Sequence, residues 1–174
     1  VALYAGSDNY RLTDNYVCGN FAQDDGGGVA HYGLSRDGLI GWNTIVFNQT
    51  FVQAAVPFGG VGAGGGLMVS GVSPVVGNPI QISEGAGSVA IVSNLIQGNN
   101  AGTGDGAGVL LRTINGLDVS ASPTNSSTWY HVELFNNIIV NNVAGLAGGG
   151  IAMQDAAKVT MINNTVAHND STAT

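Results

Sequence analysis

Acidic residues beside glycine-rich turns are the strongest candidates for chemistry in this 174-residue sequence. Asp24 and Asp25 precede one such turn and Asp105 precedes another, and Asp25 and Asp105 each lie four residues before a valine. Two carboxylates roughly 5–10 Å apart can hydrolyse glycosides, and oxygen-rich turns can bind calcium. We therefore expect Asp25 and Asp105 to be solvated turn aspartates without a cofactor. Calcium binding by Asp25 and Asp105 is the first alternative, and inverting hydrolysis is the second.

The other residue types that support catalysis are few and scattered. His31, His131 and His168 fall at different positions of their segments, and no Ser-His-Asp order is legible. His31 and His168 are expected at inward or rim positions, where a structural histidine is the common case. Cys18 is the only cysteine, so it forms no internal disulfide, and no His/Cys metal spacing occurs. The sequence names no catalytic residue and leans against an enzyme.

Aromatic residues suggest a second kind of site. Trp129 and Tyr130 end a polar insertion, and Trp42 lies in a repeated segment. Aromatic faces suit the apolar faces of sugar rings, so Trp129 and Tyr130 form a candidate glycan-binding pair. Loop anchoring or core packing is the alternative role for both residues.

Charge excludes whole classes of partner. Only 9% of the residues are Asp, Glu, Lys or Arg, and the formal net charge is −7. The four cations form no cluster, so the sequence offers no nucleic-acid or anionic-membrane surface. No apolar run reaches the roughly 18–20 residues of a membrane span. The start lacks both Met and a basic region, so we expect the sequence to begin inside a longer precursor.

A six-residue motif that recurs along the chain must position these side chains. The pattern Asn-x-h-x-x-Asn, in which h is aliphatic, occurs five times, and its closest copies are 27 and 28 residues apart. Strands that stack about 4.8 Å apart place equivalent residues directly above one another. The first asparagines should then form a hydrogen-bonded ladder, and each should occupy the left-handed bend between two strands. The ladder residues are Asn15, Asn43, Asn94, Asn137 and Asn164.

A glycine motif completes the repeating unit. Residues 26–28, 64–66, 106–108 and 148–150 read Gly-Gly-Gly or Gly-Ala-Gly, and each opens an alternating apolar segment. Three short strands per turn of about 27 residues predict an all-β, three-faced, right-handed parallel β-helix with four to five coils. We assign residues 1–174 to this single unit, with insertions at residues 73–87 and 115–130.

The two motifs together resemble a known group of proteins. The run Ile139–Asn142 followed by Gly148–Ile151 is similar to the repeats of polymorphic outer-membrane proteins and autotransporter passengers. More broadly, nearly the whole chain resembles the pectin-lyase-like β-helix superfamily. The resemblance implies a secreted or surface-displayed bacterial protein. It also implies that any polysaccharide-cleaving site would lie on the outer face of the strand that follows the glycines.

That outer face carries no carboxylate in the sequence. Alternation assigns eight positions to it: Ala30, Met68, Leu110, Ala152, Tyr32, Ser70, Arg112 and Gln154. We therefore expect a non-catalytic extracellular solenoid that acts as a surface spacer, an adhesin-like passenger or a head-to-tail assembly unit. Neither end resembles a polar cap, so further coils or identical subunits are the expected partners. A carbohydrate-active or glycan-binding module remains the alternative.

Overall fold

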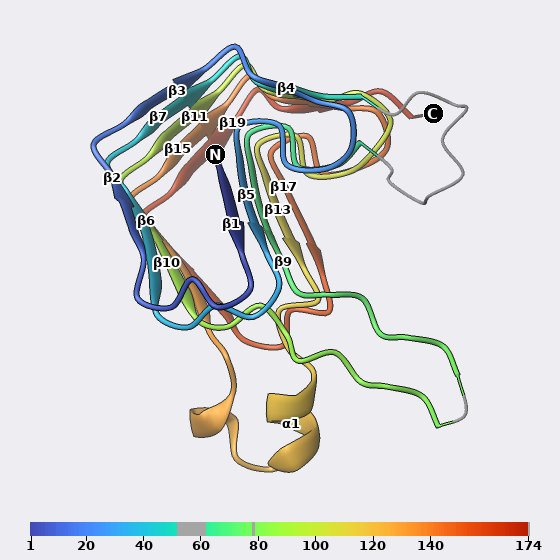
Figure 1. The fold of residues 1–174 in the computed structure, drawn as a ribbon. Coiled ribbons are helices and arrows are strands. Elements are labelled where there is room, and N and C mark those ends of the chain that lie inside the picture. The colour runs from blue at the N-terminus through green and yellow to red at the C-terminus, as the bar shows by residue number, and fades with distance from the viewer. Residues whose placement is uncertain (52–61, 78, 174) are drawn as a thin grey trace.

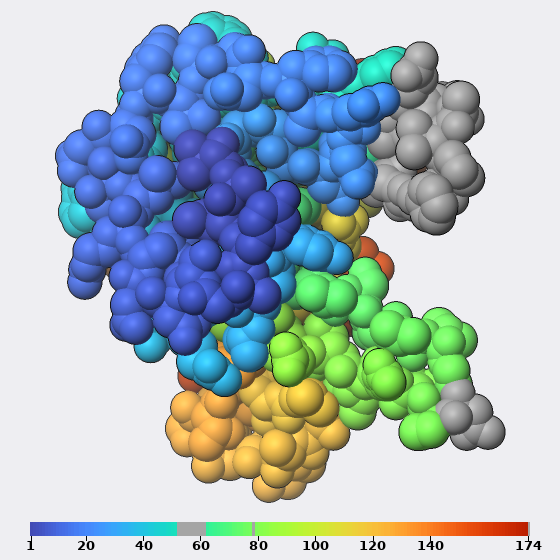
Figure 2. Space-filling model, viewed as in Figure 1, coloured from blue at the N-terminus to red at the C-terminus, as the bar shows by residue number. Residues whose placement is uncertain are grey.

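The chain winds into a right-handed parallel β-helix. The computed structural model describes residues 1–51, 62–77 and 79–173. In Figure 1 the first coil runs down β1, up β2, along β3 and out along β4, which is a clockwise path for the viewer. Later coils lie farther from the viewer, since the N-terminal coils cover them in Figure 2. A clockwise path that recedes is right-handed, as the sequence predicts.

Every coil contributes one strand to each of four parallel sheets, A to D. Sheet A contains β1 (Ala2–Tyr4), β5 (Val29–Tyr32), β9 (Leu67–Ser70), β13 (Val109–Arg112) and β17 (Ile151–Gln154). Sheet B contains β2 (Arg11–Thr13), β6 (Gly38–Gly41), β10 (Val89–Val92), β14 (Val132–Phe135) and β18 (Val159–Ile162). Sheet C contains β3 (Tyr16–Cys18), β7 (Thr44–Val46), β11 (Leu95–Gln97), β15 (Ile138–Val140) and β19 (Thr165–Ala167).

Sheet D corrects the prediction of three faces. Its two-residue strands are β4 (Phe21–Ala22), β8 (Gln49–Thr50), β12 (Asn100–Ala101), β16 (Val143–Ala144) and β20 (Asp170–Ser171). Two residues are too few to show a period of two in a sequence, so the pattern of the residues did not reveal this fourth strand. The parallel pairing of consecutive coils is nevertheless complete, because each strand of sheet D aligns with the next.

The interior consists of stacked aliphatic rows. Ile45, Ile96 and Ile139 are fully buried in sheet C, and Leu67 and Val109 are fully buried in sheet A. These residues belong to one continuous cluster that runs through the coils. Burial of apolar surface provides about 25 cal/mol per Å², so this cluster is the main source of stability.

Tyr10 and His31 interrupt the aliphatic core. Gly38 makes room for the Tyr10 ring, because a Cβ on Gly38 would lie 2.4 Å from it. The Tyr10 hydroxyl lies 2.8 Å from His31 Nδ1, and His31 Nε2 lies 3.0 Å from the carbonyl of Gly33 and 2.9 Å from that of Ala86. Two carbonyl partners require a proton on Nε2, so Nδ1 accepts from the tyrosine. His31 is thus a satisfied structural histidine, as expected.

Two long connections leave the coils between sheets A and B. Residues 71–88 join β9 to β10 and include an antiparallel bridge between Val75 and Gln81. Residues 113–131 join β13 to β14 and contain α1 (Leu117–Ala121) and η1 (Ser126–Thr128). We call them the first and second insertions. Both project from the same edge of the solenoid, below the coils in Figure 1.

Candidate functional site

The first asparagine of each repeat forms the expected ladder between sheets B and C. In each pair the backbone N–H and the side-chain Nδ2 of one asparagine both donate to Oδ1 of the next, at 2.9–3.0 Å. Asn94 Nδ2 also donates to the carbonyl of Ile40, which lies one coil back. Asn43, Asn94 and Asn137 are buried, and their side-chain amides are hydrogen-bonded. The ladder prediction is confirmed.

A second ladder, which the sequence reasoning missed, runs between sheets C and D. It consists of the last asparagine of each repeat: Asn20, Asn48, Asn99, Asn142 and Asn169. Its bonds have the same pattern and measure 2.8–3.0 Å. The signal was present in the sequence, because both asparagines of the pattern recur in all five copies.

The left-handed bends are one residue away from their predicted place. The residue before each ladder asparagine has a positive φ, whereas the ladder asparagines do not. These bend residues include Trp42 (φ 54°) and Phe47 (φ 55°), while other coils have Gly19, Gly98 or Asn136 there. Bulky side chains rarely adopt this conformation. The prediction was wrong because the chain bends at the residue before, while the ladder asparagine directs both its backbone N–H and its Nδ2 to the next coil.

The glycine motif lets two backbones approach closely. A Cβ on Gly66 would lie 2.9 Å from Nδ2 of Asn99, and one on Gly28 would lie 2.8 Å from Nδ2 of Asn48. A Cβ on Gly65 would lie 2.4 Å from the carbonyl oxygen of Asn100 in sheet D. The glycines therefore pack against sheet D and the second ladder, where a Cβ would clash.

Asp25 and Asp105 occupy equivalent turns, and each links its coil to the next. Asp25 Oδ1 accepts the backbone N–H of Ala63 at 2.8 Å, and Asp105 Oδ1 accepts that of Ala147 at 3.0 Å. Asp25 also forms an ion pair with Arg112, at 2.5 Å between Oδ2 and Nη2. Both carboxylates thus have structural partners. Calcium binding by Asp25 and Asp105 stays a prediction.

Asp24 stands beside this ion pair. Burial and the neighbouring Asp25 carboxylate raise the pKa of Asp24, and the Arg112 guanidinium only partly offsets them. Within the described residues, no group of three or more His, Cys, Asp or Glu side chains gathers in a way that could hold a metal ion.

The outer face of sheet A is more enclosed than alternation suggested. Met68 and Leu110 point away from the main core, yet they are buried in a separate small cluster with Ala63. The glycine turns fold over them, since a Cβ on Gly64 would lie 2.8 Å from Cβ of Met68. Ser70 is also buried there. The positions were predicted to face outward, and the covering turns were not foreseen.

The remaining candidate nucleophile and bases lie apart. Cys18 is exposed on β3, as its predicted outward position requires. His131 Nε2 lies 2.8 Å from the hydroxyl of Thr160, and its Nδ1 lies 3.6 Å from Glu133, on the outside of sheet B. His168 occupies an exposed left-handed bend, so of the two expected positions, inward or rim, the inward one is excluded.

Trp129 and Tyr130 anchor the second insertion. The indole N–H of Trp129 donates to the carbonyl of Ser122 at 2.8 Å, which closes the loop over α1. Tyr130 is half-buried against the main core. These contacts are the anchoring role that the sequence left open, and glycan binding by the pair stays a prediction.

Other aromatic side chains are much more exposed. Five of them lie in residues 16–51 of the first two coils, along sheets C and D: Tyr16 (69%), Phe21 (62%), Trp42 (54%), Phe47 (61%) and Phe51 (44%). The Phe21 and Phe51 rings are 6.5 Å apart. We call this set the aromatic face. Sequence reasoning singled out only Trp42 from it.

Asn115 and Asp118 hold the second insertion to the solenoid. Asn115 donates to Asp118 and to the carbonyl of Tyr130, and its Oδ1 accepts the N–H of Ala157 at 2.8 Å. The Asp118 carboxylate also accepts the backbone N–H of Gly116 and of Tyr130. Burial raises the pKa of Asp118, but these hydrogen bonds outweigh it and leave the pKa below its ordinary value. Asp118 is therefore ionised at neutral pH.

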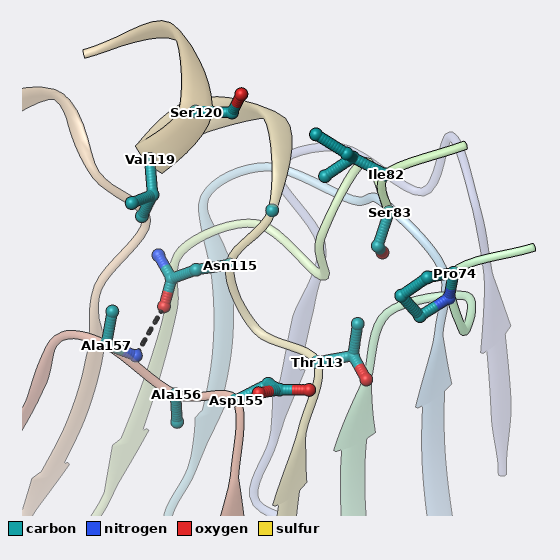
Figure 3. A pocket seen from close by; sticks show the side chains of 11 residues that line it. Pro74, Ile82, Ser83, Thr113, Asn115, Val119, Ser120, Asp155, Ala156 and Ala157 are labelled. Carbon is teal, nitrogen blue, oxygen red and sulfur yellow. Dashed lines mark hydrogen bonds between the residues drawn. The ribbon is translucent and has the colours of Figure 1, made fainter. Parts of the chain in front are cut away.

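A pocket of about 580 Å³ lies between the two insertions and the last coil. Pro74, Ile82 and Ser83 come from the first insertion, Val119 and Ser120 come from α1, and residues 155–157 come from the turn after β17 (Figure 3). Thr113 and Asp155 lie next to each other on neighbouring coils, because the backbone N–H of Thr113 donates to Gln154 and that of Ile114 to Asp155. Pockets of this size hold small ligands.

No known protein-family model, curated protein or solved structure matches the chain. No helix in the described part of the chain is long and apolar enough to cross a lipid bilayer. The proposals for function therefore depend on the geometry of the chain itself: the two ladders, the aromatic face and the pocket between the insertions.

Proposed function

We propose that this chain is a non-catalytic solenoid of an extracellular, bacterial surface protein, where it acts as a stiff spacer that displays binding surfaces. The observation that carries the proposal is the pair of asparagine ladders, which run without interruption through all five described coils. Their buried amides bond to both neighbouring coils. Bending one coil away from the next would leave these groups unpaired, at about 1–3 kcal/mol each.

The similarity of the repeats to autotransporter passengers and to the pectin-lyase-like superfamily supports the extracellular setting. An enzymatic role has less support, because Arg112 and Asp25 pair with each other across the outer face of sheet A. The histidines lie elsewhere: His31 is in the core and His131 is on sheet B.

Two measurements test this proposal. Immunogold labelling of intact source cells with an antibody against the second insertion should mark the outer surface, and labelling only after permeabilisation would contradict the proposal. Incubation with pectate, alginate and neutral polysaccharides should release no new chain ends. Turnover by the purified chain would make the carbohydrate-active alternative the correct one.

The aromatic face favours a second candidate function, the binding of a neutral glycan. Residues 13–22 and 42–51 contain one charged side chain, Asp14, so the face has little attraction for ionic partners. Trp42 and Phe47 are also held in a backbone conformation that costs roughly 1–2 kcal/mol, while more than half of each side chain is exposed. Strain without burial is a mark of functional sites.

Two substitutions separate glycan binding from folding. Phe47→Gly and Trp42→Ser copy the residues that other coils have at these bends, Gly98 and Ser93, so the variants should fold. Retention of the chain on insoluble neutral polysaccharide should fall at least severalfold in the double variant. Unchanged retention would exclude the aromatic face as the binding surface.

Further coils are the partners that the fold favours. In the last described coil Met161 and Val166 are 42% and 47% exposed, whereas their counterparts Leu134 and Ile139 are fully buried. A coil stacked on this one, from the same chain or from another molecule, would cover these rows and extend both ladders with the same bonds. Size-exclusion chromatography over a wide concentration range measures whether separate molecules associate in this way.

A further inference from the structure

The pocket between the insertions has two features that its role in folding does not explain. The first is strain. The residues that directly follow β5, β9, β13 and β17 are Gly33, Gly71, Thr113 and Asp155. Thr113 and Asp155 both have a φ of 51°, in the left-handed region where a β-branched residue such as threonine is a rare outlier. The coil of β5 has Gly33 at this place, where a positive φ costs little, so a strained side chain first occurs here at Thr113, beside the pocket.

The second feature is unused hydrogen-bonding capacity. Asp155 is exposed, and among the described residues its carboxylate forms no ion pair or hydrogen bond, so it is open to a ligand. The same part of the chain supplies no partner for the Thr113 hydroxyl, although only 5% of this residue is exposed. The Ser83 hydroxyl accepts from the N–H of Gly85. Its O–H and its second lone pair remain free to bond in the pocket. Figure 3 shows Thr113 and Asp155 together at the bottom of the pocket.

The rest of the lining is aliphatic. Pro74, Ile82 and Val119 form the walls, and Ala156 lies beside Asp155. No Lys, Arg, Phe, Tyr or Trp is among the lining residues. The only formal charge in the lining is therefore negative, and Asp118 behind Asn115 adds a second carboxylate nearby.

We propose that this pocket binds an aliphatic primary ammonium group. The three N–H donors of a primary ammonium match acceptors that line this pocket, the Asp155 carboxylate and the Thr113 and Ser83 hydroxyls. The methylene chain of the ligand would lie against Pro74, Ile82 and Val119. The inference deepens the proposed function, on which it rests, because it names the ligand class of one surface that the spacer displays.

Other ligand classes fit the same atoms less well. An anion would face the Asp155 and Asp118 carboxylates without a cation among the lining residues. A quaternary ammonium is recognised by aromatic faces, and the lining has none. A divalent metal needs several oxygen or nitrogen ligands, and Asp155 is the only carboxylate in the lining.

Isothermal titration of the full 174-residue chain with n-butylamine, butyltrimethylammonium and butyrate tests the proposal. We expect saturable binding of n-butylamine at neutral pH and at least tenfold weaker binding of the other two probes. Asp155→Asn keeps a residue that accepts a positive φ and should weaken n-butylamine binding about tenfold or more. The control Asp170→Asn, which changes an exposed carboxylate on β20, should leave binding unchanged.

A second variant separates strain from binding. Thr113→Gly should weaken n-butylamine binding severalfold and raise the thermal unfolding midpoint by about 2 °C or more, because it removes the left-handed strain. Equal affinity in wild type and Asp155→Asn, equal affinity for butyrate, or an absence of saturable binding would each overturn the amine site. None of these results would change the outcome of the surface labelling or of the polysaccharide assay, which test the spacer function.

Two further ligands distinguish the source of the amine. Cadaverine represents a free diamine, and Nα-acetyl-lysine methylamide represents a lysine side chain of a partner protein. Tighter binding of the lysine derivative would assign the pocket to a protein partner, and tighter binding of cadaverine would assign it to a small molecule. Either order supports the primary ammonium class, whereas binding of neither would contradict it.

Discussion

The two sides of the solenoid differ in how much the lengths of their connections vary from coil to coil. Every connection from sheet B to C and from sheet C to D has two residues, a left-handed one and a ladder asparagine, in all five coils. Connections from sheet A to B instead range from four to 19 residues, the extremes being residues 155–158 and 113–131. We call these the ladder side and the insertion side.

The difference follows from how backbone groups are satisfied. On the ladder side each asparagine must meet its neighbours above and below, so one added residue would break the bonds of three coils. On the insertion side no side chain repeats from coil to coil, and a loop that satisfies its own polar groups can be any length. Stability therefore concentrates on the ladder side, and the insertion side is left to form the pocket.

Removal of one central ladder amide should have the largest effect on stability. Asn94→Ala would leave the N–H of Asn43 and the carbonyl of Ile40 buried without partners. We expect a loss of about 4 kcal/mol in the free energy of unfolding, measured by urea denaturation. Asn15→Ala, in the exposed first coil, should cost about 1 kcal/mol, and equal losses for the two variants would contradict the ladder account.

A methyl group between the glycine motif and the second ladder should have the next largest effect. In Gly66→Ala the new Cβ would meet the carbonyl of Gly108 and the amide of Asn99 at 2.8 and 2.9 Å. We expect a loss of about 2–3 kcal/mol, read from the same denaturation curves. The control is Gly77→Ala on the insertion side, where the nearest atom would be 3.5 Å away. If both variants kept wild-type stability, close packing of the glycines would not matter.

The buried histidine should make stability depend on pH. Burial lowers the pKa of His31 below its ordinary value near 6.5, and its hydrogen bonds to Ala86 and Gly33 offset this only in part. Below pH 6.5 the unfolded chain takes up the proton more readily than the folded chain. The stability of the fold is therefore fully present above about pH 6.5 and falls as the pH drops.

The expected slope of this decline is at most about 1.4 kcal/mol per pH unit for one histidine. Unfolding curves between pH 7 and pH 5 measure it. His31→Gln retains a donor and an acceptor but does not titrate, so its curve should be flatter. An identical slope in this variant would show that other groups cause the pH dependence.

Shortening the first insertion should have the smallest effect. The bridge between Val75 and Gln81 brings the two arms together, so residues 76–80 can be replaced by Gly-Gly without stretching the chain. We expect the free energy of unfolding to change by less than about 1 kcal/mol. A loss comparable to that of Asn94→Ala would erase the distinction between the two sides.

The sequence predicted the ladder side well because that side repeats. The parallel β-helix, the interior rows and the first ladder all follow from five copies of one pattern. The second ladder was visible as the last asparagine of each copy, for example Asn99, but only the first was recognised. The bend residue was misplaced by one position, since glycine, serine and tryptophan share no pattern that marks a bend.

The insertion side was beyond prediction because nothing repeats there. No pattern in the residues indicated a short helix at Leu117–Ala121, or a pocket with Ile82 and Val119 on opposite walls. Asp25 precedes β5 and Arg112 ends β13, so their ion pair spans two steps of sheet A. Such contacts depend on how loops fold over the coils, and short polar segments contain little local information about that.

Native-state hydrogen exchange of single amides tests the division into two sides most directly. The backbone amides on the ladder side each donate to the buried side-chain oxygen of the next ladder asparagine, as those of Asn43, Asn48, Asn94 and Asn99 do. They should exchange only through global unfolding, whereas the amides of Val75 and Gln81 on the insertion side should exchange through local opening. Equal protection of both groups, or faster exchange on the ladder side, would contradict the account.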